Sequence, residues 1–402
     1  MSRTIIWALG LFMFVAATNR YGPAPEADAV PGDAFVYLRL AAAAPGLPAP
    51  EGFALHHLQR IALPYTVGML GRAVPVPLHT VFQAAALLFA LTILLVASRT
   101  LRRLHVGGAA AAAALALMAL NPWALRFTLR FPEMLPDLGF VLGLSLQLHG
   151  LVTRQPAGVI TGQVAASLSR QTGLALIPVV VLWLWRDKDW QNTAPSRRAA
   201  LAGATAAAAA AIYGATAWLM ADVAAIDENA IHIAGLWSWL RAGPDMAILA
   251  AFFLSATLAP LAAVALLVTP SRTPAVAEPK MVLLVLAFVC VAIQPVLGGP
   301  AVTGGNAPRL TALGLLPLCL AAGIALSRAG WPVGGRQWPL WGVVAALAAG
   351  SMHHWYVLSD SPTFSDRLTF AVASAVACAT VIYTTWRFSR HAHGSTRQST
   401  PG

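Results

Sequence analysis

Charged side chains are scarce in this 402-residue chain, in which Asp, Glu, Lys and Arg make up only 10% of the residues. Soluble globular domains carry about 25% charged and about 45–50% apolar residues, whereas 58% of this chain is hydrophobic. The composition therefore excludes an ordinary water-soluble enzyme. Because the excess consists of Ala, Leu, Val and Trp, the polar composition typical of intrinsic disorder is excluded as well.

Cysteine is also scarce, since only Cys290, Cys319 and Cys378 occur, each inside an apolar stretch. Their spacing contains no Cys-x-x-Cys motif, so the sequence predicts neither a disulfide framework nor a cysteine metal site. We expect all three to be small core side chains without a redox role.

Acidic residues are few, with 15 Asp and Glu against 26 Lys and Arg, which gives a net charge of +11. A basic protein that binds nucleic acid needs a basic face on a soluble domain. Here the basic residues lie in short clusters between apolar runs. We therefore expect no nucleic-acid partner, and we interpret the charge as a signal of membrane topology.

Apolar runs of span length, by contrast, are abundant. A helix needs about 20 apolar residues to cross a bilayer, with a usual range of about 17–25. The sequence predicts an all-α fold, a polytopic transmembrane bundle of about 12 spans. The predicted spans are 4–18, 80–98, 106–121, 138–153, 157–169, 173–185, 199–221, 246–268, 281–297, 310–327, 338–352 and 368–385. The first follows Arg3 as in a signal peptide, but we expect it to be retained.

The basic residues predict the orientation of these spans. With both termini in the cytoplasm, 16 of the 26 Lys and Arg residues fall inside, together with only 3 of the 15 acids, as the positive-inside rule requires. We predict one transmembrane domain, 1–385, in the cytoplasmic (inner) membrane of a bacterium. Its first outer loop, 19–79, contains interfacial helices, and 386–402 form a basic cytoplasmic tail that we expect to be disordered.

Arg170 decides how the chain crosses the membrane near the middle of the sequence. A single helix over 158–185 would place this arginine in the hydrocarbon at a cost of about 2.5–3.5 kcal/mol. It would also export the basic cluster 186–198. We therefore predict two short helices that meet at an outer turn around Arg170.

The first outer loop carries the most informative polar residues. Asp33 and Tyr37 are four residues apart and share a helical face, and His57 can share a face with Arg60. Asp33 suits a general base at the membrane surface, and its alternative role is a helix N-cap. Adjacent His56 and His57 point to different faces of a helix, and no carboxylate is spaced to join them, so no metal site is predicted.

Two further outer segments contain acids and arginines. Glu133 and Asp137 lie at the start of the span at 138, where the helix dipole favours acids. Asp137 either caps this helix, or orients a substrate sugar or an arginine of the first loop. Arg170 and Arg309 lie outside against the positive-inside bias. Each either snorkels to the bilayer surface or binds a lipid phosphate through its guanidinium fork.

Five features follow one another in order along residues 1–330 on the predicted outer face. They are Gly32-Asp33 with Tyr37, Arg60 with Pro64-Tyr65, Pro136-Asp137, Leu168-Ser169-Arg170 before the apolar run Leu174–Pro178, and Pro308-Arg309-Leu310. This order resembles the GT-C superfamily of polytopic membrane glycosyltransferases, in particular its bacterial branches.

The resemblance implies a transferase of the cell envelope that takes a sugar from a polyprenyl-phosphate donor on the periplasmic face. It implies that Asp33 is the general base and that Arg170 and Arg309 contact the donor phosphate. We also expect substrate contacts from Tyr37, His57, Arg60, Glu133 and Asp137. The expected partners are membrane lipid, the lipid-linked sugar, and a glycan, lipid or protein acceptor. No further cofactor is predicted, and the need for a divalent metal is left open.

Three other functions stay open. An envelope polysaccharide polymerase or ligase would use similar outer arginines for a lipid pyrophosphate. A transporter or flippase would carry lipid-linked or small solutes without chemistry, although transporters usually place charges at mid-membrane and these span interiors hold few. An acyl- or phosphotransferase would use His56 or His57 with Asp33.

Overall fold

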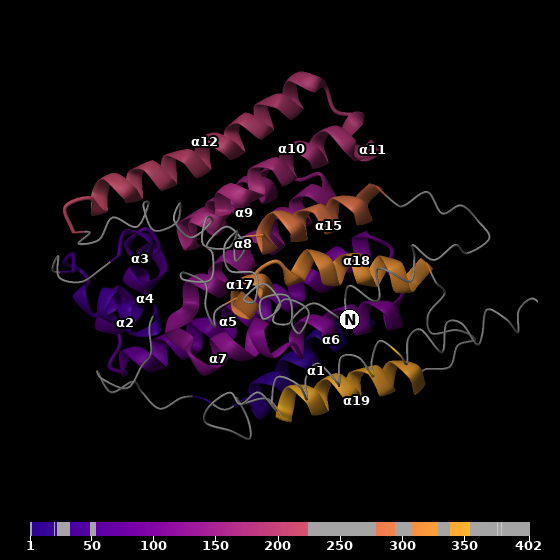
Figure 1. Cartoon of the computed structure of the whole chain (residues 1–402), viewed down its shortest axis with the longest axis horizontal. Helices are drawn as coiled ribbons and strands as arrows, with labels where there is room; N and C mark the ends of the chain where they lie inside the picture. Colours follow the sequence, from indigo (N-terminus) through magenta and orange to yellow (C-terminus); the bar gives the residue numbers. More distant parts are fainter. Residues whose placement is uncertain are drawn as a thin grey trace, which may run out of the picture.

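The computed structural model describes residues 2–19, 21, 33–48, 54–223, 279–293, 307–328 and 338–353, together with 376 and 379. Within these ranges the chain is all-helical and contains no β-strand (Figure 1). The all-α prediction is confirmed for this part of the chain. The predicted span 246–268, most of 368–385 and the tail 386–402 lie outside the described residues.

The first outer loop forms short helices, as predicted. They are α2 (Asp33–Ala43), α3 (Leu55–Leu58) and α4 (Ala62–Ala73), which lie together at one end of the long axis (Figure 1). The first helix, α1 (Arg3–Thr18), packs against the next long helices of the chain. The loop 19–79 is thus a structured element at the end of the bundle wherever it is described.

The remaining helices form the body of the bundle. They are α5 (Leu78–Arg103), α6 (Gly108–Ala119), the π-helical turn η1 (Pro122–Arg126), α7 (Phe127–Arg130), the 3₁₀ turn η2 (Pro132–Met134), α8 (Leu135–Thr153), α9 (Pro156–Ser169), the 3₁₀ turn η3 (Gln171–Leu176), α10 (Ile177–Arg186), α11 (Lys188–Gln191), α12 (Pro195–Met220), α15 (Pro279–Ala292), α17 (Ala307–Ala312), α18 (Leu315–Arg328) and α19 (Trp338–His353). The described residues of the predicted spans are mostly helical, and the end of the predicted span 281–297, after residue 293, lies outside the described residues.

The apolar helices identify a membrane protein. Four helical stretches of the described chain are long and apolar enough to cross a bilayer: Leu78–Arg103, Gly108–Arg130, Pro132–Thr153 and Pro195–Met220. Other apolar helices, such as Arg3–Thr18, are shorter. Hydropathy measures the length of an apolar run, but turns and proline-containing breaks divide that run into shorter helices. The number of about 12 spans therefore stays a prediction.

The helix is interrupted at Arg170, as predicted from the free-energy cost of placing an arginine in the hydrocarbon. Helix α9 ends at Ser169, Arg170 is extended, and η3 leads into α10. The side chain of Gln163 donates to the carbonyl of Gly173 at 2.8 Å, and a Cβ at Gly173 would lie 2.8 Å from the Cα of Ser167. The chain therefore folds back on itself, and the two short helices are confirmed.

Helices α8 and α9 pack closely through glycines. A Cβ at Gly143 would lie 2.3 Å from the backbone nitrogen of Ala166, and one at Gly162 would lie 2.3 Å from that of Gln147. Small residues let membrane helices approach closely and gain van der Waals contact. Gly143 and Gly162 therefore provide an internal packing surface between the two helices of this hairpin.

The loops predicted to lie inside and outside gather at opposite ends of the bundle. Arg102, Arg154 and Lys280 line one cavity together with Thr153, the last residue of α8. Asp137, in the first turn of the same helix, lies in a polar network at the other end. At 1.5 Å per residue, the Cα atoms of Asp137 and Thr153 are about 24 Å apart.

The glycine contacts predict the cost of adding a methyl group between α8 and α9. Gly162→Ala should lower the free energy of unfolding by about 1–3 kcal/mol, because its Cβ meets backbone atoms that cannot move aside. Gly203→Ala in α12 is the matched control, since its Cβ meets nothing within 4 Å. Thermal unfolding of the purified protein in detergent measures both. Equal stability of Gly162→Ala and the wild type would contradict this packing.

Candidate functional site

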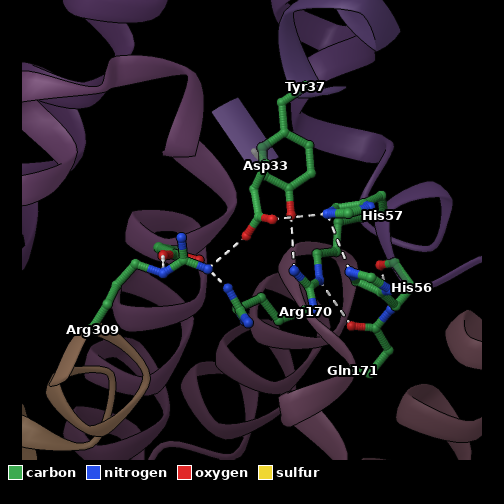
Figure 2. A network of polar contacts seen from close by, with 9 residues as sticks. Asp33, Tyr37, His56, His57, Arg170, Gln171 and Arg309 are labelled. Carbon is green, nitrogen blue, oxygen red and sulfur yellow. Dashed lines mark hydrogen bonds and ion pairs between the residues drawn. The ribbon is translucent and has the colours of Figure 1, made fainter. Parts of the chain in front are cut away.

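A polar network joins five segments at one end of the bundle. The contributing segments are α2, the turn around α3, the start of α8, the turn at Arg170, and α17. Figure 2 shows the side chains of these segments pointing toward one another. Residues that are far apart in the sequence thereby form one cluster in which arginine and aspartate alternate.

Asp33 lies at the centre of this network, between His57 and Arg309 (Figure 2). His57 Nε2 lies 3.0 Å from Asp33 Oδ1, and a guanidinium nitrogen of Arg309 donates to Asp33 Oδ2 at 2.6 Å. Burial opposes ionisation of this carboxyl, but the hydrogen bond with His57 and the charge of Arg309 outweigh it. They hold the pKa of Asp33 well below its usual range, so the side chain is a carboxylate at neutral pH.

Arg309 links Asp33 to a second carboxylate. Its Nε lies 3.4 Å from Asp137 Oδ2, and Asp137 also forms an ion pair with Arg170. The guanidinium of Arg309 lies 5.6 Å from the centre of the Phe127 ring, where a cation is attracted to the aromatic face. Asp137 and both arginines are less than 10% exposed. The charges are therefore neutralised by each other rather than by water.

A second branch of the network surrounds Arg60. This arginine donates to Tyr37 Oη and to Gln171 Oε1, both at 2.9 Å. The amide of Gln171 donates in turn to the carbonyl of His56 and to Gln59 Oε1, both at 2.7 Å. Burial raises the pKa of Tyr37, so its hydroxyl stays neutral. Gln171 thus ties the turn beside Arg170 to the first outer loop.

Sequence reasoning did not assign Gln171 to the site. The available signal was its position next to Arg170 in a turn between two helices, because a polar side chain there faces the same end of the bundle. The shared face of Asp33 and Tyr37 was predicted correctly, since Asp33 bonds to His57 and Tyr37 contacts the edge of the His57 ring.

The expectation that His56 and His57 point apart is wrong. Their rings are 3.8 Å apart, and the two Nε2 atoms are 3.1 Å apart. Helix α3 has only four residues, so helical periodicity does not separate neighbouring side chains as it does in a long helix. Burial, together with the charge of Arg60, lowers the pKa of His56 to about 2. A carboxylate partner, Asp33, is supplied by a different helix.

For three other predicted site residues, the contacts in the structure disagree with at least one of the predicted roles. Asp137 is the third residue of α8, and its partners are Arg170 and Arg309. It is therefore neither a helix cap nor a partner of a first-loop arginine. Arg170 is buried and does not snorkel. Glu133 contacts His79 at 2.6 Å and does not join the network, because η2 turns its side chain toward α5.

The network has an excess of positive charge and unused hydrogen-bond donors. Arg60, Arg170 and Arg309 outnumber the carboxylates of Asp33 and Asp137. The Nε atoms of Arg170 and Arg309 are buried and donate no hydrogen bond. A pocket of about 10 Å³, enough for one water, adjoins Arg170 between η3 and α12. Because a buried unused donor is costly, the site is suited to an incoming anion.

A metal site is not evident in the part of the chain that the structure describes, where no group of three His, Cys, Asp or Glu side chains could hold an ion. Among the described residues, Cys290 and Cys319 are free cysteines. The charged and ionisable side chains that the network brings together are those of Asp33, Tyr37, His56, His57, Arg60, Asp137, Arg170 and Arg309.

The pKa of Asp33 predicts how the site responds to acid. The folded-state pKa is lower than the unfolded value of about 3.9, so the unfolded chain binds a proton first and stability falls as the pH decreases. The stability difference between the wild type and Asp33→Asn should be largest above about pH 5 and shrink below it. Thermal unfolding from pH 3 to pH 7 measures it, and a difference independent of pH would contradict the ion pairs.

Comparison of the chain with family models, with curated proteins and with solved structures found no match in any of the three.

Proposed function

We propose that this protein is a membrane glycosyltransferase that takes a sugar from a polyprenyl-phosphate donor. One observation carries the proposal: the buried Arg309, Asp137 and Arg170 and the partly exposed Asp33 form a connected set of ion pairs at one end of an apolar helical bundle. A lipid-linked donor places its phosphate at the membrane surface, where such a cluster meets it. The order of motifs resembling the GT-C superfamily supports the same assignment.

The arginines are suited to hold the donor phosphate. Guanidinium groups bind phosphate bidentately, and charge-assisted hydrogen bonds are stronger in a site that excludes water. Arg170 has a buried Nε that donates no hydrogen bond, and the buried Nε of Arg309 has an ion pair with Asp137 at 3.4 Å but also donates no hydrogen bond. Because the pocket beside Arg170 holds about one water, the phosphate enters by replacing a carboxylate on Arg309. The donor thus opens the network as it binds.

Asp33 is the proposed general base. The acceptor hydroxyl attacks the anomeric carbon, its proton passes to Asp33, and the bond from that carbon to the phosphate oxygen breaks. Polyprenyl phosphate leaves with the electron pair. Asp33 is a weak base while Arg309 and His57 hold it, so a phosphate that draws Arg309 away raises its basicity when the donor is present. Tyr37 and Arg60 keep the helix of Asp33 against the turn at Arg170.

The proposal includes a membrane and an orientation. We infer a bacterial inner membrane with both termini in the cytoplasm and about 12 spans, in which the shorter apolar helices also cross the bilayer. The polar network then faces the periplasm. The acceptor is a glycan, a lipid or a protein of the cell envelope.

Removal of the base should stop transfer without preventing membrane insertion. A strain that lacks the gene should accumulate a polyprenyl-phosphate sugar, detected by mass spectrometry of its lipids. Plasmid-borne wild type and Arg72→Ala should clear this lipid, because Arg72 is exposed on α4 outside the network. Asp33→Asn and Arg170→Ala should not clear it. Clearance by Asp33→Asn at the wild-type level would refute the assignment of the base.

A second function is favoured by the contact between His57 and Asp33. A histidine oriented by a carboxylate can activate a nucleophile or carry a transferred group, as in acyl or phosphoryl transfer. His57 Nε2 is bonded to Asp33 at 3.0 Å, so the two residues have the geometry of such a pair. The same pair serves the glycosyltransferase only by positioning Asp33.

Substitution of His57 separates the two functions. In a glycosyltransferase with Asp33 as base, His57→Gln keeps a hydrogen-bond donor near the carboxylate, and the accumulated lipid should still be cleared at a reduced rate. In a histidine-dependent transferase the same variant is inactive, because glutamine neither accepts a proton nor carries a group. Lipid analysis of the complemented strain measures the clearance rate, and complete loss in His57→Gln would favour the second function.

A further inference from the structure

A large basic cavity lies at the end of the bundle opposite the polar network. Its volume is about 630 Å³, within the range of about 300–1,000 Å³ typical of ligand sites. Its walls come from the end of α5, the turn between α8 and α9, α11 and the start of α15. The charged or ionisable residues that line it are Arg102, Arg103, His105, Arg154, Asp189 and Lys280.

The charges of this cavity are unbalanced. Asp189, the acid among its lining residues, accepts from Lys280 at 2.6 Å. Arg102, Arg103 and Arg154 form no hydrogen bond or ion pair through their side chains within the described residues. Membrane topology alone requires basic residues somewhere in the inside loops. It does not require that arginines of separate loops surround one cavity.

Two residues of the cavity wall have a left-handed backbone conformation, which is unfavourable for any residue with a side chain. His105 and Arg154 have φ values of 55° and 58°, and they are the non-glycine residues with positive φ in the part of the chain that the structure describes. Each follows or ends a long helix, where glycine usually occupies this left-handed conformation. Both positions therefore carry a cationic or ionisable side chain where glycine would be favoured.

The length of α5 indicates that the helix end lining the cavity extends beyond the hydrocarbon core. Helix α5 has 26 residues, about 39 Å, so it exceeds the hydrocarbon core of about 30 Å, and Arg102 and Arg103 lie in its last turn. Basic pockets between the ends of membrane helices bind phosphate-bearing headgroups. We propose that this cavity is a binding site for a phosphate ester, in which Arg102, Arg103 and Arg154 surround the anion and Lys280 is held at the rim by Asp189.

Anionic phospholipids and soluble phosphate compounds share this chemistry, and the experiment separates them. Full-length protein is purified in a zwitterionic detergent and stripped of lipid. Micelles with phosphatidylglycerol or with neutral phosphatidylcholine form the lipid arm, and ADP at constant ionic strength forms the soluble arm. Binding is followed by the quenching of tryptophan fluorescence and by the shift of the unfolding temperature. Saturable binding of phosphatidylglycerol alone identifies a lipid site, and binding of ADP identifies a soluble ligand.

Arg154→Gly is the decisive variant. It removes a cation from the cavity but relieves the left-handed backbone, so its unfolding temperature should equal or exceed that of the wild type. Its affinity for the bound probe should fall about tenfold, the loss of one charge-assisted hydrogen bond. Arg102→Ala with Arg103→Ala should weaken binding further, and Arg154→Lys should keep most of it.

Arg197→Ala is the matched control, because Arg197 is an exposed cation at the same end of the bundle that does not line the cavity. Its affinity should equal that of the wild type. The proposal is overturned if neither phosphatidylglycerol nor ADP binds. It is also overturned if the arginine variants of the cavity bind as tightly as Arg197→Ala.

Discussion

The burial of arginine at the end of an apolar bundle is the constraint on which the polar network depends. A guanidinium removed from water is tolerated only when a carboxylate and hydrogen-bond acceptors replace its hydration. Asp137 meets this requirement for Arg170, and Asp33 meets it for Arg309. The short helix pair at Arg170, the start of α8 and the position of α17 follow from bringing these charges together. Loss of one partner would leave an uncompensated charge in the core.

The same ion pairs link structure to the proposed chemistry. Charges that neutralise each other are held in position by their ion pairs, and such preorganisation is what a transition state with developing charge requires. Arg309 is shared between two carboxylates, so an added anion redistributes its contacts rather than creating a new site. The proposed proton acceptance by Asp33 and the proposed phosphate binding by Arg309 would therefore be coupled through one guanidinium. The basic cavity at the opposite end has no such carboxylate balance.

Much of the fold and part of the candidate site could be predicted because they depend on local properties. The helical class and the break at Arg170 follow from hydropathy and from the cost of a charge in hydrocarbon. The common face of Asp33 and Tyr37 follows from helical periodicity. The contact between His56 and His57 was missed because α3 is too short for that periodicity to hold. The partner of Glu133 was missed because no sequence signal connects it to His79.

By itself, the sequence predicted the helical class that the described residues have and the apolar helices typical of a membrane protein. It also assigned acids and arginines to particular loops, because each of these properties is set by neighbouring residues. Only the tertiary structure determined which of these side chains contact one another. Asp33 and Arg309 are 276 positions apart, and Arg60 and Gln171 are 111 apart. Such contacts arise from the packing of helices through small residues and buried charges. Interactions over these separations depend on the whole bundle, so a local pattern cannot contain them.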